Sequence, residues 1–264
     1  MPEPMILDTI IAYKHRELQE RQTSLPLAEL AVRAKEAAPP RDFAEALQTP
    51  KIGAVSLIAE VKKASPSVGI IRDDFDPVAI AKTYEDNGAS CLSVLTDEKF
   101  FQGHDAYLEG IQESNSLPIL RKDFVVSDWQ IYESRALRAD AVLLIVAALS
   151  PMQIADYQAI AHELGMAALV EVHTEAEMEV ALGANATLIG INCRDLNTFV
   201  TDLGSVERLA PMVPKSVTLV VESGLKTPAD VRRVADAGAK AILVGETLMR
   251  SPDIGAATRA LLGG

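Results

Sequence analysis

A glutamate and a lysine, Glu60 and Lys62, close one of the apolar runs of this sequence, in the segment EVKKASPSVG. Such a run is typical of a buried strand, whose side chains alternate between two faces, so the two charges should point the same way. Burying both charges is costly unless they pair with one another or act on a ligand. A positioned carboxylate and ammonium group can move protons, so acid–base chemistry is the functional interpretation and a structural ion pair is the alternative.

Comparable polar residues follow five other apolar runs. Lys122 ends one of them, between Arg121 and Asp123, and Glu171 ends another. The rest of this set comprises Asn192 with Arg194 after it, Glu222 with Ser223 and Gly224, and Gly245 with Glu246. Each residue alone is more often structural than catalytic, but their joint presence at run ends favours a functional cluster. Arg121 and Asp123 alternate with Lys122, so we expect them to point away from the cluster as structural partners.

The apolar runs predict how these residues come together. Beyond residue 50, eight runs alternate with polar stretches of helical periodicity, at residues 56–61, 91–95, 117–123, 141–146, 167–172, 188–193, 218–223 and 241–245. The runs are almost continuously hydrophobic, as strands buried on both faces are. Eight strand–helix units predict an α/β fold, the (β/α)8 TIM barrel, in which the carboxyl ends of all strands meet at one face. An open doubly wound sheet is the alternative, disfavoured because no G-x-G-x-x-G motif follows the first run.

The first 50 residues lie outside this repeat and predict an N-terminal helical extension. Segments MILDTIIAYKHRELQERQ, PLAELAVRAKEAAPP and RDFAEALQ each have the character of a helix. We expect a single domain over residues 1–264, with an extension at 1–50 packed on a barrel at 51–264. Periodicity slightly favours a plug under the barrel, and a lid near its active face is the alternative.

The composition excludes several classes of protein. A formal net charge of −12 disfavours nucleic acid and anionic membranes as partners, although a local group of amides and lysines can still bind a small anion. Cys91 and Cys193 lie in apolar runs without metal-ligand spacing, so we expect no metal, no disulfide framework and a reducing cytoplasm. The N-terminus lacks a signal-peptide pattern, and no apolar run approaches the roughly 18 residues that a membrane helix needs.

A phosphate site is predicted after the last two runs. Ser223 and Gly224 follow the seventh run, and Gly245 and Glu246 follow the eighth. In TIM barrels these two loops commonly bind phosphate through backbone N–H groups, which glycine allows to approach the anion closely. Ordinary strand–helix turns also favour serine and glycine, but here both pairs fall at the expected places. A small phosphorylated molecule is therefore the expected ligand.

Six segments, taken together, resemble the indole-3-glycerol-phosphate synthase family of tryptophan biosynthesis. They are IAEVKKASPSVG, LTDEKFFQG, LPILRKDFVV, LVEVHTEAE, IGINCRDLNTF and VVESGLKTPADV, which follow in order along essentially the whole barrel. The E-x-K-x-x-S-P-S and R-K-D-F patterns are the specific ones. In this family the N-terminal extension helps to cover the substrate, so the resemblance favours the lid.

The resemblance implies a lyase that needs no cofactor or metal. The family converts 1-(2-carboxyphenylamino)-1-deoxyribulose 5-phosphate to indole-3-glycerol phosphate by ring closure, decarboxylation and dehydration. We expect a monomer, and contact with other tryptophan-pathway enzymes stays open.

The resemblance also implies roles residue by residue. Lys122 would be the general acid on the substrate ketone during ring closure. Glu171 and Lys62 would be acid–base groups for closure and dehydration, in an order that stays open. The other catalytic residues would be Glu60 and Asn192. The substrate would be bound by Ser65, Phe101, Phe124, Arg194 and Glu222, with Phe101 and Phe124 beside the anthranilate ring. The phosphate would be bound by Ser223, Gly224, Gly245 and Glu246.

The two lysines raise a question of acidity. A free lysine has a pKa of about 10.4 and is a weak acid at neutral pH. Two lysines in one partly desolvated pocket should lower the pKa of one of them toward the operating range.

Two rival functions remain. The sister barrel phosphoribosylanthranilate isomerase would have a cysteine at the end of the first strand, where this chain has Glu60 and Lys62. A non-catalytic phosphometabolite-binding barrel would keep the phosphate loops but would need none of Lys62, Lys122 and Glu171.

Overall fold

Eight parallel strands close into a barrel in the computed structural model, which describes residues 5–195 and 200–264. The strands are β1 (Ser56–Val61), β4 (Cys91–Leu95), β5 (Ile119–Lys122), β6 (Ala141–Ile145), β7 (Ala167–Val172), β8 (Leu188–Asn192), β9 (Thr218–Glu222) and β10 (Ala241–Val244). The first and last strands close the ring, since Ile58 of β1 lies beside Cys91 of β4 and Leu243 of β10. The predicted TIM barrel is confirmed, and the open sheet is wrong.

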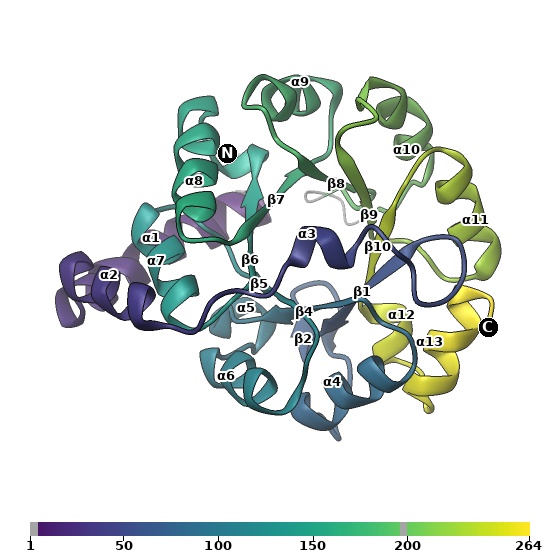
Figure 1. Cartoon of the computed structure of the whole chain (residues 1–264), viewed down its shortest axis with the longest axis horizontal. Helices are drawn as coiled ribbons and strands as arrows, with labels where there is room; N and C mark the ends of the chain where they lie inside the picture. Colours follow the sequence, from purple (N-terminus) through teal and green to yellow (C-terminus); the bar gives the residue numbers. More distant parts are fainter. Residues whose placement is uncertain (1–4, 196–199) are drawn as a thin grey trace.

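Helices separate the strands and surround the barrel (Figure 1). They are α4 (Pro77–Asp86), α5 (Glu98–Phe101), α6 (Asp105–Ser114), α7 (Asp128–Ala136), α8 (Pro151–Glu163), α9 (Glu175–Gly183), α10 (Gly204–Leu209), α11 (Pro228–Asp236), α12 (Glu246–Met249) and α13 (Ile254–Leu262), with short 3₁₀ turns η1 (Val146–Ala148) and η2 (Ala210–Met212). Asp76 and Thr227 cap α4 and α11, each before a proline in the first turn, as the sequence predicts. Across the described ranges, no helix is long and apolar enough to cross a membrane.

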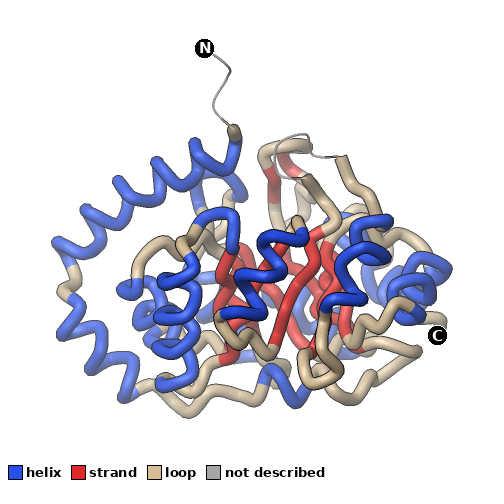
Figure 2. The backbone as a smooth tube through the Cα atoms, turned by 90° about the horizontal axis from the view of Figure 1, so that it is seen from above, coloured by secondary structure: helices blue, strands red, loops and turns tan. Residues whose placement is uncertain are grey.

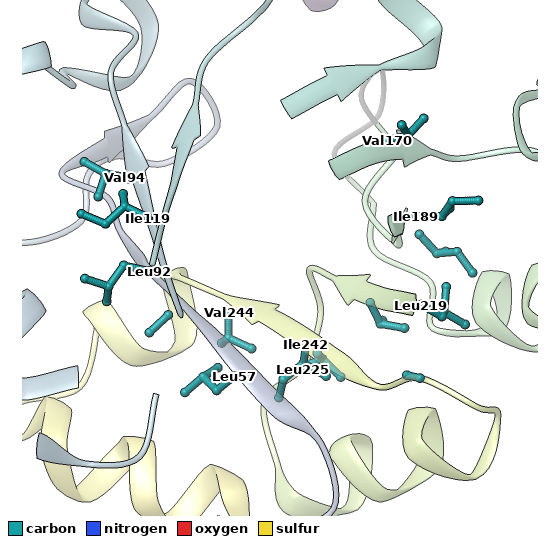
Figure 3. Close-up of a cluster of buried hydrophobic side chains, with 14 of the residues drawn as sticks. Leu57, Leu92, Val94, Ile119, Val170, Ile189, Leu219, Leu225, Ile242 and Val244 are labelled. Atoms are coloured by element: carbon teal, nitrogen blue, oxygen red, sulfur yellow. The ribbon is translucent and has the colours of Figure 1, made fainter. Parts of the chain in front are cut away.

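Strand alternation divides the apolar residues into two buried layers. Side chains such as Leu57, Leu92 and Ile119 face the outer helices, where Figure 3 shows them with residues from other strands. Ile58 and Leu120, one position along, point instead into the barrel. Both faces of each strand are buried, which is why the sequence shows continuous apolar runs.

The inward series becomes polar toward the carboxyl ends of the strands. Leu120 is followed two residues later by Lys122, and Leu169 by Glu171. The intervening Arg121 lies on the outer side, where its guanidinium pairs with Asp105 and Glu133 of the helix layer. The strand period of two thus places the polar cluster at one mouth of the barrel.

Most strands are shorter than the runs that predict them. β1, β4 and β7 match, whereas β5, β6, β8, β9 and β10 end before the final predicted residue. At β9 the reason is backbone geometry, because Ser223 and Gly224 both have positive φ angles, 69° and 80°, which an extended strand cannot contain. In these five runs the last predicted residue therefore lies in the turn that leaves the barrel, while Lys122, Asn192 and Glu222 are the last residues of their strands.

The N-terminal extension reaches both ends of the barrel. It contains α1 (Ile6–Ser24), α2 (Leu27–Glu36) and α3 (Phe43–Ala46). Figure 2 shows α1 beginning near one end of the barrel and sloping away from it. Ile6 and Ile10, near the start of α1, line the cavity at the strand carboxyl ends. Phe43 of α3 packs instead against residues near the strand beginnings, including Ala141 and Ala241, and α3 stands in front of the ring in Figure 1. The extension therefore places α1 at the mouth formed by the strand carboxyl ends and α3 at the opposite end.

Candidate active site

One cavity at the carboxyl ends of the strands contains every residue that the sequence nominates for the site. Its lining includes Glu60, Lys62, Ser65, Phe101, Lys122, Phe124, Glu171, Asn192, Arg194, Glu222, Ser223, Gly224, Gly245 and Glu246. Ile6, Leu7 and Ile10 of α1 complete the wall. The structure thus brings together residues up to 186 positions apart, from Glu60 to Glu246, while their individual roles stay predictions.

Lys122 lies between two glutamates at the centre of the cavity. Its Nζ is 2.6 Å from Glu222 Oε2 and 3.3 Å from Glu171 Oε2. Burial disfavours the charged ammonium group, but Glu222, Glu171 and Glu60 outweigh burial and raise the pKa of Lys122 above its usual range.

The predicted lowering of a lysine pKa is therefore wrong for Lys122 in the ligand-free site. The prediction considered repulsion between lysines and did not include the carboxylates that surround this one. Lys122 stays protonated through the neutral range and is ready to donate a proton or a hydrogen bond.

Glu222 is the acidic group whose ionisation is most disturbed. Burial raises its pKa to about 7, assisted by Glu171 and Glu60 and opposed by Lys122. Its Oε1 is buried without a hydrogen-bond partner in the described chain. Gly190 of β8 leaves the space for this oxygen, because a Cβ there would overlap it. Glu222 can therefore hold or release a proton near neutral pH.

Glu171 has a different environment, although it too is paired with Lys122. Burial alone would raise its pKa, but Lys122, His173 and a hydrogen bond from the Asn192 side chain lower it. Asn192 is held in turn by the backbone N–H of Arg194, which donates to its Oδ1 at 3.1 Å. Glu171 is thus the ionised member of the two carboxylates beside Lys122.

Glu60 and Lys62 form the ion pair that their spacing suggests, with Lys62 Nζ 2.7 Å from Glu60 Oε1. Burial opposes the ionised form of Glu60, but Lys62, Lys122 and Arg194 lower its pKa. A Cβ at Gly245 would overlap the Glu60 carboxylate. Glycine is therefore needed at the end of β10 for the placement of Glu60, whatever part it has in binding phosphate.

Two phenylalanines form an apolar wall of the cavity. The rings of Phe101 and Phe124 lie 5.9 Å apart between centroids, tilted by 38°. Each is anchored by an aspartate: Asp97 Oδ1 accepts from the backbone N–H of Phe101, and Asp123 Oδ1 from that of Phe124. Such a wall suits a flat aromatic ligand.

The loops after β8, β9 and β10 line the same cavity. Arg194 donates to Glu246 Oε2 at 3.1 Å, so a cation offsets the carboxylate that begins α12. Ser223 and Gly224 turn the backbone sharply after β9. No group of three His, Cys, Asp or Glu side chains within residues 5–195 and 200–264 could hold a metal ion.

Comparison with known proteins reveals the family. The model of the family described as indole-3-glycerol phosphate synthase matches residues 7–261. The chain belongs to the indole-3-glycerol phosphate synthase family. Among curated relatives of that name, the protein of Rhodospirillum rubrum is 49% identical over 260 residues, 98% of this chain and 99% of the relative. The protein of Dehalococcoides mccartyi strain CBDB1 is 50% identical over 262 residues, 98% of this chain and all of the relative.

Solved structures support the fold. A crystal structure of 3-hexulose-6-phosphate synthase has a TM-score of 0.60 at 12% identity and covers 79% of this chain and 99% of its own. Thiamine phosphate pyrophosphorylase from Pyrococcus furiosus has a TM-score of 0.59 at 15% identity, covering 79% of this chain and 94% of its own. At these identities the likeness concerns the TIM barrel alone.

In this member of the indole-3-glycerol phosphate synthase family, the sequence did not predict two residues that lie close to the site. His173 lies two residues beyond Glu171, and the period of two could have placed it on the same side. Lys14 of α1 gave no signal, because a lysine within an amphipathic helix is usually exposed. In the structure it is buried against Asp97 and Asp123, the two aspartates behind the phenylalanine wall.

Proposed function

We propose that this chain catalyses the reaction of its family on 1-(2-carboxyphenylamino)-1-deoxyribulose 5-phosphate, forming indole-3-glycerol phosphate, carbon dioxide and water. The observation that carries the proposal is Lys122, which lies between Glu171 and Glu222 in the cavity lined by Phe101 and Phe124. One cation with two carboxylates, in a cavity that also has an aromatic wall, suits a reaction that needs several proton transfers beside an aromatic ring.

Lys122 is the acid of ring closure in this proposal. The carboxyl-bearing ring carbon bonds to the ketone carbon, and Lys122 gives a proton to the ketone oxygen, which becomes a hydroxyl group. Loss of carbon dioxide then leaves its bonding electrons in the ring system. The carboxylates that raise the pKa of Lys122 ensure that it carries a proton when the substrate arrives.

Dehydration then needs an acid at the new hydroxyl group and a base for the proton lost from the ring system. Lys62 and Glu171 are the candidates, on β1 and β7 respectively. The hydroxyl leaves as water with a proton from Lys62, and Glu171, whose pKa is lowered, accepts the other proton. Glu60 lies 2.7 Å from Lys62 and orients its ammonium group.

The substrate phosphate is assigned to the loops after β9 and β10. Gly224 and Gly245 let the backbone approach an anion closely, and Ser223 adds a hydroxyl group. Glu246 is a carboxylate and contributes through its backbone N–H, while Arg194 offsets its charge. With the phosphate here, the aromatic end of the substrate extends toward Phe101 and Phe124.

The test is an assay of purified protein for the indole fluorescence of the product, with wild type and Lys122→Ala. Loss of a positioned acid should lower kcat by about 10²–10⁴-fold with a smaller change in KM. Lys240→Ala is the matched control, since Lys240 is an exposed lysine just before β10, at the opposite end of the strand. Wild-type protein that makes no product would overturn the function, and near-normal kcat in Lys122→Ala would remove Lys122 from its role.

The two rivals are less well supported. An isomerase with an acidic cysteine does not fit Glu60 and Lys62 at the end of β1, and burial raises the pKa of Cys193 to about 11. A non-catalytic phosphate-binding barrel would not need Lys122 paired with two buried carboxylates. We also propose that the protein is a monomer located in the cytoplasm, and only the sequence supports this part of the proposal.

A further inference from the structure

A partly buried histidine lies next to Glu171, outside the lining of the cavity. His173 Nε2 is 3.5 Å from Glu171 Oε1, and Nδ1 is 3.2 Å from Glu177 Oε2. The Nε2 atom is inaccessible to solvent and has no hydrogen-bond partner in the described chain, although the Glu171 carboxylate is near. The side chain of His173 is 13% exposed. The imidazole therefore bridges Glu171 of β7 and Glu177 of α9 without touching the cavity.

This bridge makes the two carboxylates beside Lys122 unequal. Glu171 has two partners besides Lys122, which are His173 near its Oε1 and the Asn192 side chain. Glu222 has a buried Oε1 that no described group contacts by a hydrogen bond. Two carboxylates that share one cation in a buried site resist being ionised together, so a proton bound by the pair goes to the member with fewer stabilising partners.

We propose that His173 is a positioning residue that keeps Glu171 ionised and directs the shared proton of the pair to Glu222. This inference rests on the proposed function only for its consequence, which is that Glu171 acts as the base in dehydration. The proton distribution itself is a property of the ligand-free protein. The opposite shifts of the two carboxyl groups, with the pKa of Glu171 lowered and that of Glu222 raised, agree with the geometry.

The charges around His173 favour its protonated form. Burial opposes a charged imidazole, but Glu177 of α9 and Glu171 of β7, with Glu222 of β9 farther away, raise the pKa of His173. The turn η1 (Val146–Ala148), which packs on α9, has no charged side chain. An imidazolium beside Glu171 lowers the pKa of Glu171 in return, so the two charges support one another.

A purely structural role for His173 is the alternative. The backbone N–H of His173 donates to Glu177 Oε2 at 2.7 Å, and this bond helps to fix the start of α9. It does not involve the ring, and it remains when the side chain is changed. A structural role would therefore affect the melting temperature and leave the titration of Glu171 unchanged.

The experiment follows the carboxyl groups of Glu171 and Glu222 by ¹³C NMR over a pH series in ligand-free protein, with assignments from Glu171→Gln and Glu222→Gln. In His173→Gln the midpoint of Glu171 should rise by about one pH unit, the lower end of the effect of an adjacent opposite charge. The midpoint of Glu222 should fall, because a protonated Glu171 no longer repels its charge. His162→Gln removes an exposed histidine of α8 and should move neither midpoint.

Kinetics provide the second readout. The acid limb of kcat/KM should move to higher pH in His173→Gln by the same amount as the Glu171 midpoint. Glu177→Gln removes the carboxylate that holds the imidazole and should produce a smaller shift in the same direction, which keeps the test available if His173→Gln does not fold. Unchanged midpoints in a folded variant would overturn the inference. If the midpoints of Glu171 and Glu222 shift in opposite directions but the wild-type protein makes no product, the inference about His173 holds and the proposed function is wrong.

Discussion

Glu60 keeps its charge in a nearly closed environment because several cations surround it. Its side chain is 6% exposed and that of Lys62 is 13% exposed. We predict that Lys62→Met lowers kcat/KM by about 10²–10⁴-fold. The free energy of unfolding should fall by less than the roughly 3–5 kcal/mol that breaking a buried pair costs, since Lys122 and Arg194 still act on Glu60.

The same substitution at the next residue is the control. Lys63 lies outside the lining of the cavity, so Lys63→Met should keep normal activity. Thermal melts and steady-state kinetics of both variants decide the matter. A large fall in melting temperature with normal activity per folded molecule of Lys62→Met would make the Glu60–Lys62 pair structural.

At the scale of residues, the sequence predicted positions better than ionisation. A period of two and the carboxyl-end rule were enough to gather Lys122, Glu171 and Glu222 at one mouth. The direction of the Lys122 pKa shift was wrong because it depends on three-dimensional neighbours. The space that Gly190 provides for Glu222 has no sequence signal, since glycine in a strand has several explanations.

At the scale of elements, a buried lysine attaches the N-terminal helix to the active face. Lys14 Nζ lies 3.0 Å from Asp123 Oδ1 and 3.1 Å from Asp97 Oδ2. Lys14→Met would leave these aspartates buried with one cation fewer, and we predict a loss of about 3–5 kcal/mol in the free energy of unfolding. KM should rise as well, because Asp97 and Asp123 anchor the phenylalanine wall.

Arg21→Met is the comparison for this prediction. Arg21 also joins α1 to the barrel, through Asp105 and Glu133, but its side chain is 34% exposed and lies outside the cavity lining. It should cost less stability and leave KM unchanged. Chemical denaturation and steady-state kinetics of both variants provide the measurements. Equal KM values in the two variants would show that docking of α1 does not reach the substrate pocket.

Element positions followed from the sequence to different degrees. The helix starts at Asp76 and Thr227 were predictable because capping and proline placement are local chemistry. The placement of the extension was not, because α1 and α3 pack at opposite ends of the barrel through contacts distant in sequence. Periodicity shows that a helix has an apolar face but does not identify the surface that covers it.

At the scale of the whole molecule, the apolar core at the strand beginnings is separate from the cavity at the carboxyl ends of the strands. Phe43 of α3 is 1% exposed and packs against the inward residues near the strand beginnings, whereas Phe101 lines the cavity at the other end. We predict that Phe43→Ala lowers the free energy of unfolding by about 3–5 kcal/mol and leaves kcat/KM unchanged at temperatures where the protein is folded. The half-buried Phe101→Ala should cost less stability and raise KM, because it removes part of the aromatic wall. Denaturant unfolding and steady-state kinetics of the two variants test whether the two ends of the barrel act separately. A changed kcat/KM in folded Phe43→Ala would show that the two ends are coupled through the barrel interior.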